Sequence, residues 1–190
     1  MPSPSLPFRL LAISDRRSGE IDLSKLASHG GALLLRDKDM TRDARAEFGR
    51  TVRAQTKALG IPLIVHGDVG LARELQATGL HLPARTAPRP ERGLIVGCSC
   101  HDEGELLRAV EAGVDYVTLS PVLLSPRKGQ AMGWARFAVL ARSCSLPVFG
   151  LGGLGPKDLA EAQKHGAWGV AGIRGFLEVG PQAGSGVMPS

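Results

Sequence analysis

Residues 147–175 read PVFGLGGLGPKDLAEAQKHGAWGVAGIRG, and this stretch decides the fold. An apolar run at 147–151 leads into a glycine-rich loop, a helix-like stretch at 156–165, the helix-ending Gly166 and a second apolar run at 169–173. Parallel strands covered on both faces lack polar alternation, and these runs are nearly all apolar. The segment therefore predicts two parallel strands joined by a helix.

The same pattern recurs along the chain, which predicts repeated β/α units. The expected strands are 8–13, 32–35, 62–65, 79–82, 94–96, 116–119, 147–151 and 169–173. The expected helices are 23–27, 41–58, 69–77, 102–112, 134–142 and 156–165. The connection 83–92 contains three prolines, so we expect a loop or a single turn there instead of a helix.

Eight such units in 190 residues predict one eight-stranded parallel β/α (TIM) barrel, irregular at the fourth crossover. An open doubly wound sheet is the alternative, but it would gather ligands at one switch point instead of around all the strand ends. We assign residues 1–177 to a single TIM-barrel domain. Residues 178–190 are rich in Gly, Pro, Ser and Gln, which predicts a flexible C-terminal tail.

Composition restricts the class of partner. No apolar run is long enough to cross a bilayer, and the first residues lack the features of a secretory signal. Three cysteines do not suggest a disulfide framework, so we expect a cytoplasmic protein without a membrane partner. The net charge of +5 suits an anionic ligand. Aromatic residues make up only 4%, which argues against nucleic acid.

Basic and glycine residues follow the expected strand ends, where a barrel places its reactive groups. Glycine-rich loops at 150–155 and 169–175 can expose backbone N–H groups to a phosphate, although tight turns also use glycine. We call the carboxyl end of the barrel, where these residues gather, the mouth. The stretch 120–129 is expected to form a flap over it, with an ordinary solvated loop as the alternative. The cations at these strand ends are Arg16, Arg36, Lys38, Arg127, Lys128 and Arg174.

Four stretches carry a family resemblance: LAISDR at 11–16, LLLRDK at 33–38, SPVLLSPRK at 120–128 and FGLGGL at 149–154. They resemble thiamine phosphate synthase and its relative, the thiazole tautomerase. The resemblance implies a barrel enzyme of thiamine biosynthesis that acts on hydroxyethylthiazole phosphate. The synthase joins this thiazole to a pyrimidine methyl pyrophosphate and releases pyrophosphate with magnesium. The tautomerase moves a proton on the thiazole carboxylate phosphate.

The resemblance also assigns site residues. It implies that backbone groups near Gly152, Gly153, Ile173 and Arg174 hold the thiazole phosphate, and that Ser99 lies near the pyrimidine and pyrophosphate. The substrate-binding and phosphate-binding residues implied in this way are Arg36, Lys38, Ser99, Ser125, Arg127, Lys128, Gly152, Gly153, Ile173 and Arg174.

The chain departs from the family pattern at the magnesium end. The family's Asn-Asp pair is His66-Gly67 here, and its second acid is Thr86. Leu34 replaces a glutamine expected at the pyrimidine end. Magnesium needs hard oxygen ligands, so the loss of both acids favours a metal-independent reaction. Asp68 could replace the lost acid only with a loop shift.

These departures favour a tautomerase-like enzyme with no cofactor and no metal. Pro121 stands where the tautomerase histidine is expected, so His66, His101 and Lys128 are proposed as catalytic, with His81 and Cys100 as further proton carriers. Magnesium enters only in the alternative of a divergent synthase that couples thiazole phosphate to pyrimidine pyrophosphate. A non-catalytic binder of phosphorylated thiazole is the third alternative, and a homodimer is left open.

Overall fold

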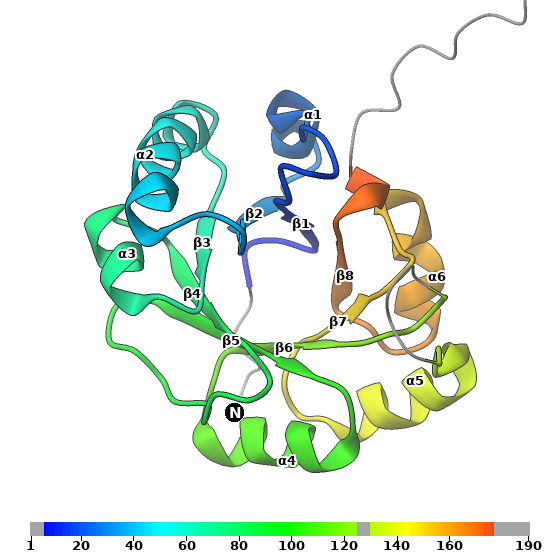
Figure 1. The fold of residues 1–190 in the computed structure, drawn as a ribbon. Coiled ribbons are helices and arrows are strands. Elements are labelled where there is room, and N and C mark those ends of the chain that lie inside the picture. Colours follow the sequence, from blue (N-terminus) through cyan, green and yellow to red (C-terminus); the bar gives the residue numbers. More distant parts are fainter. Residues whose placement is uncertain (1–5, 125–129, 177–190) are drawn as a thin grey trace, which may run out of the picture.

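The computed structural model describes residues 6–124 and 130–176 and consists of one closed barrel of eight parallel strands (Figure 1). Each strand pairs with the next along the chain, and the last pairs with the first. This confirms the TIM-barrel prediction. The strands are β1 Leu10–Ile13, β2 Ala32–Leu35, β3 Leu63–His66, β4 Gly79–Leu82, β5 Ile95–Cys100, β6 Tyr116–Leu119, β7 Val148–Leu151 and β8 Gly169–Gly172.

Helices surround the barrel, and their ends follow the sequence signals. Thr41 accepts a hydrogen bond from the Ala44 N–H at the start of the second helix, and Gly113 ends the fourth in the left-handed conformation. The helices are α1 Leu23–Ser28, α2 Arg42–Ala58, α3 Val69–Glu74, α4 Glu103–Ala112, α5 Gly133–Ser143 and α6 Leu159–Lys164, with short 3₁₀ turns η1 Pro156–Asp158 and η2 Arg174–Phe176.

Several expected bounds shift at their ends, as in the helix expected at 69–77, which ends at Glu74, and the strand expected at 8–13, which begins at Leu10. Two elements differ more. The strand expected at 94–96 extends to Cys100, because β4 and β6 pair with it on both sides and satisfy its backbone groups. The helix expected at 156–165 is split into η1 and α6, since the fixed φ of Pro156 starts a tight first turn. No helix connects β4 to β5, so the irregular fourth crossover is confirmed.

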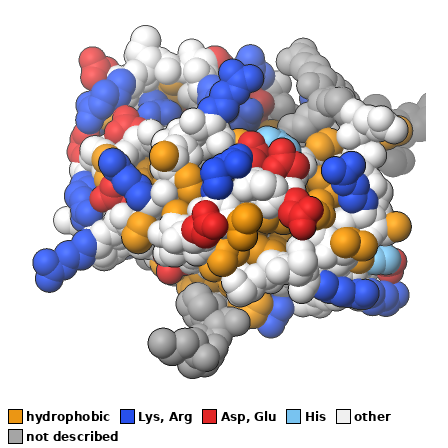
Figure 2. Space-filling model, turned by 90° about the horizontal axis from the view of Figure 1, so that it is seen from below, with side chains coloured by type: hydrophobic (Ala, Val, Ile, Leu, Met, Phe, Trp, Pro, Cys, Tyr) orange, Lys and Arg blue, Asp and Glu red, His pale blue; other side chains and the backbone are white. Residues whose placement is uncertain are grey.

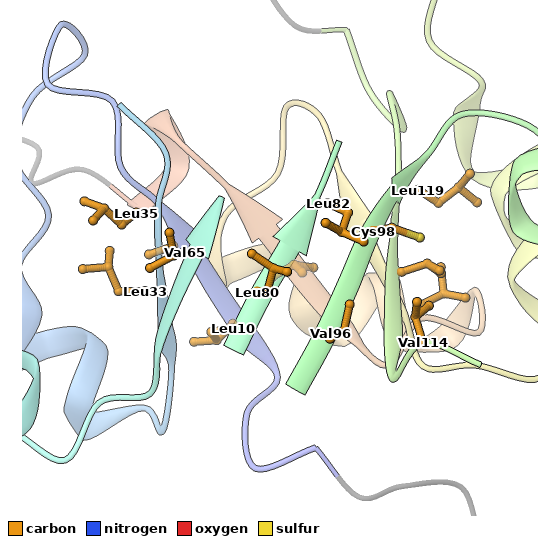
Figure 3. Close-up of a cluster of buried hydrophobic side chains, with 14 of the residues drawn as sticks. Leu10, Leu33, Leu35, Val65, Leu80, Leu82, Val96, Cys98, Val114 and Leu119 are labelled. Carbon is orange, nitrogen blue, oxygen red and sulfur yellow. The ribbon is translucent and has the colours of Figure 1, made fainter. Parts of the chain in front are cut away.

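Alternate strand residues form two separate cores. Along each strand, every second side chain points outward and packs with helix residues in one cluster; Leu33, Val65, Leu80 and Cys98 are examples (Figure 3). The others point into the barrel, where Phe8, Leu11, Leu34, Tyr116 and Phe149 are among the buried side chains. The position of a residue in its strand therefore decides whether it reaches the barrel interior, where a site can form.

The Tyr116 ring fills the lower barrel interior because β5 makes room for it. A Cβ atom at Gly97 would lie 2.1 Å from the ring, so only glycine fits. The ring packs edge-on against Phe149 at 5.4 Å and Phe8 at 6.0 Å between centroids. The barrel is thus closed by a hydrophobic floor, and the polar side chains that point inward among residues 6–124 and 130–176 lie at its upper, carboxyl end.

On the face that carries α4, acidic, basic and apolar side chains are interspersed, and neither sign of charge forms a continuous patch (Figure 2). None of the described helices has the length and apolar composition to cross a membrane. The expected tail at 178–190 lies outside the described residues.

Candidate functional site

Four polar side chains occupy the last inward positions of β3 to β6, at the carboxyl end of the barrel. The His81 ring nitrogens lie 3.1 Å from the Tyr116 hydroxyl and 3.0 Å from the Ser99 hydroxyl. The His66 and His81 ring centroids are 6.2 Å apart. Thr118 is fully buried, and its hydroxyl has no hydrogen-bond partner among the described residues. These residues form a polar layer above the hydrophobic floor.

Both histidines of this layer are neutral near pH 7. Burial, followed by the charges of His66 and Lys38, lowers the pKa of His81 to about 3. Burial and the nearby Lys38, Arg36 and Arg45 lower the pKa of His66 to about 4. A neutral imidazole can exchange hydrogen bonds with a ligand, but a pKa this low makes it a weak base at neutral pH.

The basic residues predicted after β2 lie beside His66. Lys38 is exposed, and partial loss of water around its ammonium group, followed by the Arg36 charge, lowers the pKa of this lysine. The Arg36 guanidinium lies 3.8 Å from the Asp15 carboxylate, which also pairs with Arg17 at 3.3 Å. Asp15 therefore orders the basic loop. The structure brings the predicted Arg36, Lys38 and His66 together at one end of the mouth.

Asp37 is a site residue that the sequence analysis missed. Its carboxylate is 1% exposed, accepts a hydrogen bond from the Ser14 hydroxyl and accepts another from the Arg16 N–H at 2.9 Å. The Ser14 hydroxyl in turn accepts the Arg36 N–H at 3.0 Å. This chain of bonds ties the ends of β1 and β2 together and holds the Arg36 backbone. Its signal in the sequence is an acid enclosed between two cations.

Asp68 is already occupied by other groups. It caps α3 by accepting the Leu71 N–H at 2.9 Å, and its other oxygen lies 3.2 Å from Arg45 and 3.7 Å from Arg42. Among residues 6–124 and 130–176 no three His, Cys, Asp or Glu side chains come together as metal ligands. Magnesium needs only one or two carboxylates beside substrate phosphates, so the test of fit is Asp68 itself. Asp68 would have to leave Arg42, Arg45 and the start of α3 to bind the magnesium ion that the family resemblance implies, and as paired here it does not fit that role.

The opposite end of the mouth is built from backbone. Gly152 and Gly153 have φ angles of 109° and 67°, and a Cβ atom on Gly153 would lie 2.8 Å from the Leu124 carbonyl oxygen. The Leu123 N–H donates to the Gly152 carbonyl at 3.1 Å. The loop after β6 thus lies directly on the loop after β7. These glycines have a packing reason in addition to the phosphate role predicted for them.

The end of β8 joins the same assembly. Ile173 follows the strand directly, and Arg174 opens η2. A Cβ atom on Gly172 would lie 2.4 Å from the Leu154 carbonyl oxygen, and one on Gly155 would lie 2.7 Å from the Gly175 carbonyl oxygen. Close contact between the two loops brings Gly152, Gly153, Ile173 and Arg174 to one end of the mouth.

Two of the candidate proton carriers need correction. Cys100 points outward into the helix-facing core, where its sulfur lies 4.0 Å from that of Cys98 and the hydrogen bond to Cys98, followed by burial, raises the pKa of the Cys100 thiol. It faces away from the mouth because it alternates with the inward-facing Ser99. His81 faces the mouth but uses both nitrogens on Tyr116 and Ser99, which leaves neither free for substrate.

The remaining predicted residues fall into two groups. His101 lies beside the end of β6, with its Nδ1 atom 2.8 Å from the Ser120 carbonyl oxygen and 3.2 Å from the Ser120 hydroxyl. Ser125, Arg127 and Lys128 lie outside the described residues, so their roles stay predictions.

The fold and the mouth define a β/α-barrel protein whose polar site lies at the carboxyl ends of its strands, the usual place for a barrel enzyme's active site. The chain belongs to the thiamine monophosphate synthase family, whose model matches residues 10–176. This places it in a family of thiamine biosynthesis.

Individual relatives agree with the family. The thiamine-phosphate synthase of Roseiflexus sp. (strain RS-1) is 35% identical over 194 residues, which cover 93% of this chain and 81% of that protein. The thiamine-phosphate synthase of Methanoregula boonei is 32% identical and covers 85% of this chain and 80% of that protein. The solved thiamine phosphate pyrophosphorylase of Pyrococcus furiosus superposes with a TM-score of 0.75 at 27% identity, covering 88% of this chain and 86% of that one.

Proposed function

We propose that this chain is a synthase that couples a thiazole phosphate to a pyrimidine methyl pyrophosphate and releases pyrophosphate. The observation that carries the proposal is the division of the mouth into two chemically different ends. One end combines the backbone of Gly152 and Gly153 with Arg174, and the other combines Arg36, Lys38 and neutral His66. Two anion-binding ends suit two phosphorylated substrates that must meet in one site.

The geometry suits the chemistry of this coupling. The reaction breaks the bond between the pyrimidine methylene carbon and the pyrophosphate oxygen and forms a bond from that carbon to the thiazole nitrogen. Negative charge therefore accumulates on the leaving pyrophosphate. Positioned cations such as Arg36, whose backbone N–H is held by Ser14 and whose guanidinium lies 3.8 Å from Asp15, stabilise such charge with little reorganisation.

The tautomerase-like prediction receives no support from the relatives, which are named as synthases. A tautomerase needs a proton carrier in contact with its substrate, and three of the candidates are poorly suited to that role. Cys100 faces away, His81 has both nitrogens bonded, and the pKa of His66 is lowered to about 4 by burial and nearby cations, so a tautomerase would depend on His101 or Lys128. A synthase needs no such group for the bond changes given above.

The test is to incubate the purified protein with hydroxyethylthiazole phosphate and the pyrimidine pyrophosphate and to quantify thiamine phosphate by chromatography. We expect product, and we expect Arg36→Gln to lower kcat/KM by about 10- to 100-fold, since charged hydrogen bonds contribute about 1.5–3 kcal/mol. Arg89→Gln is the matched control, because that exposed arginine pairs with Glu91 at 3.2 Å in the loop after β4.

Two results would contradict the proposal. The first is a folded protein that forms no thiamine phosphate with or without magnesium, which would leave the non-catalytic binder. The second is proton exchange on thiazole carboxylate phosphate in the absence of coupling, which would restore the tautomerase-like alternative.

A further inference from the structure

The most informative group that the predictions did not use is Arg45, at the start of α2. Its side chain is 15% exposed, and its Nη2 atom lies 3.2 Å from Asp68. Its buried Nε–H has no hydrogen-bond acceptor among the described residues. Arg45 is also one of the three cations whose charge acts on His66 at the inner end of β3. A cation with an unused donor beside the mouth is suited to an anionic ligand.

We propose that Arg45, together with Arg36 and Lys38, neutralises the pyrophosphate group of the second substrate in place of a divalent metal ion. The inference rests on the proposed function, because it assigns the pyrophosphate to the β2–β3 end of the mouth. Three protein cations would then face the diphosphate charge that magnesium would otherwise screen.

The acids that follow β1, β2 and β3 within four residues are each paired with a protein group in the part of the chain that the structure describes, including Asp39, whose carboxylate lies 3.7 Å from Arg17. Asp37 is buried against Ser14 and Arg16. Asp15 pairs with Arg17 and Arg36, and Asp68 pairs with Arg42 and Arg45 while capping α3. A divalent cation would have to displace these partners and would be repelled by the guanidinium groups that remain.

Asp68 makes the two possibilities separable, because they predict opposite effects of one substitution. If Asp68 holds a metal, its loss weakens pyrophosphate binding. If Asp68 only neutralises Arg45, its loss releases that guanidinium and strengthens binding. Asparagine preserves the cap of α3, since Asn and Asp are equally good at that position.

The experiment measures binding of inorganic pyrophosphate by calorimetry to chelator-treated protein, with and without added magnesium. We expect binding without metal, and no tightening when magnesium is added. Arg45→Gln should weaken binding about tenfold or more, while Arg45→Lys should restore most of it. Asp68→Asn should strengthen it about three- to fivefold. Arg50→Gln is the matched control, because that exposed arginine of α2 pairs with Glu74 at 2.9 Å away from the mouth.

The inference is wrong if pyrophosphate binds only with magnesium or if Asp68→Asn weakens binding. Its failure is distinguishable from failure of the proposed function. Thiamine phosphate formed strictly with magnesium would support the synthase and overturn the role of Arg45. The opposite result is a protein that forms no thiamine phosphate but binds pyrophosphate without metal and responds to Arg45 and Asp68 substitutions as expected. It would support the role of Arg45 and overturn the synthase. Thermal unfolding of each variant shows whether the fold is intact.

Discussion

The two ends of the mouth differ in what they are made of. The β7–β8 end consists of backbone loops in close contact, with glycine wherever a side chain would collide. The β2–β3 end consists of charged side chains paired across strands and helices, with neutral His66 among them. A backbone site changes only if the loops move, whereas a side-chain site can be rewritten by substitution. This explains how the chain retains one half of the family pattern and departs from the other.

The largest expected effect concerns the side-chain end and pH. Above about pH 6.5 both His66 and His81 are neutral whether the chain is folded or unfolded. As the pH falls further, the unfolded chain binds protons that the folded chain excludes, because the folded pKa is about 4 for His66 and about 3 for His81. Stability should therefore fall by about 1.4 kcal/mol per pH unit for each histidine.

Urea unfolding at pH 7.5, 6 and 5 measures this loss. His66→Asn should remove about half of the histidine contribution, and His29→Asn, on an exposed residue, should leave the slope unchanged. An unchanged slope in His66→Asn would show that the imidazole is as free to protonate in the folded protein as in the unfolded chain. The β2–β3 end would then not be the strongly cationic, partly buried environment that lowers the pKa of His66.

The next effect concerns the backbone end. Gly153→Ala and Gly60→Ala both place an alanine at a left-handed position, with φ of 67° and 69°, but only the first meets a neighbour, the Leu124 carbonyl oxygen. Both should suffer backbone strain of about 1–2 kcal/mol. Gly153→Ala should cost about 1–3 kcal/mol more from crowding. Denaturant unfolding compares them, and equal losses would refute close loop contact at Gly153.

The smallest expected effect on the free energy of unfolding concerns the polar layer, which lies between the two ends of the mouth. Ser99→Ala removes the hydroxyl that lies 3.0 Å from His81, and it should lower the free energy of unfolding by about 1 kcal/mol. Ser28→Ala removes a hydroxyl that bonds the Lys25 carbonyl on the exposed α1 and should cost less than about 0.5 kcal/mol. If the two losses are the same, the layer above Tyr116 contributes nothing specific to stability.

Particular residues show how far the sequence could be interpreted. The barrel, its irregular fourth crossover and the meeting of the 150–155 and 169–175 loops were predictable, because apolar runs, prolines and glycines encode them locally. The end of β5 was not, because Ser99 and Cys100 interrupt the apolar pattern and are held in the strand by pairing on both sides. The outward direction of Cys100 follows from that longer strand.

The sequence by itself determined a β/α barrel with cations and glycines at its strand ends, since these patterns depend on neighbours a few positions away. Only the tertiary structure decided that Asp68 is paired with Arg45, that Asp37 is buried and that the pKa values of His66 and His81 are lowered. Those properties depend on burial and on charges from other strands and helices, which meet only when the barrel closes.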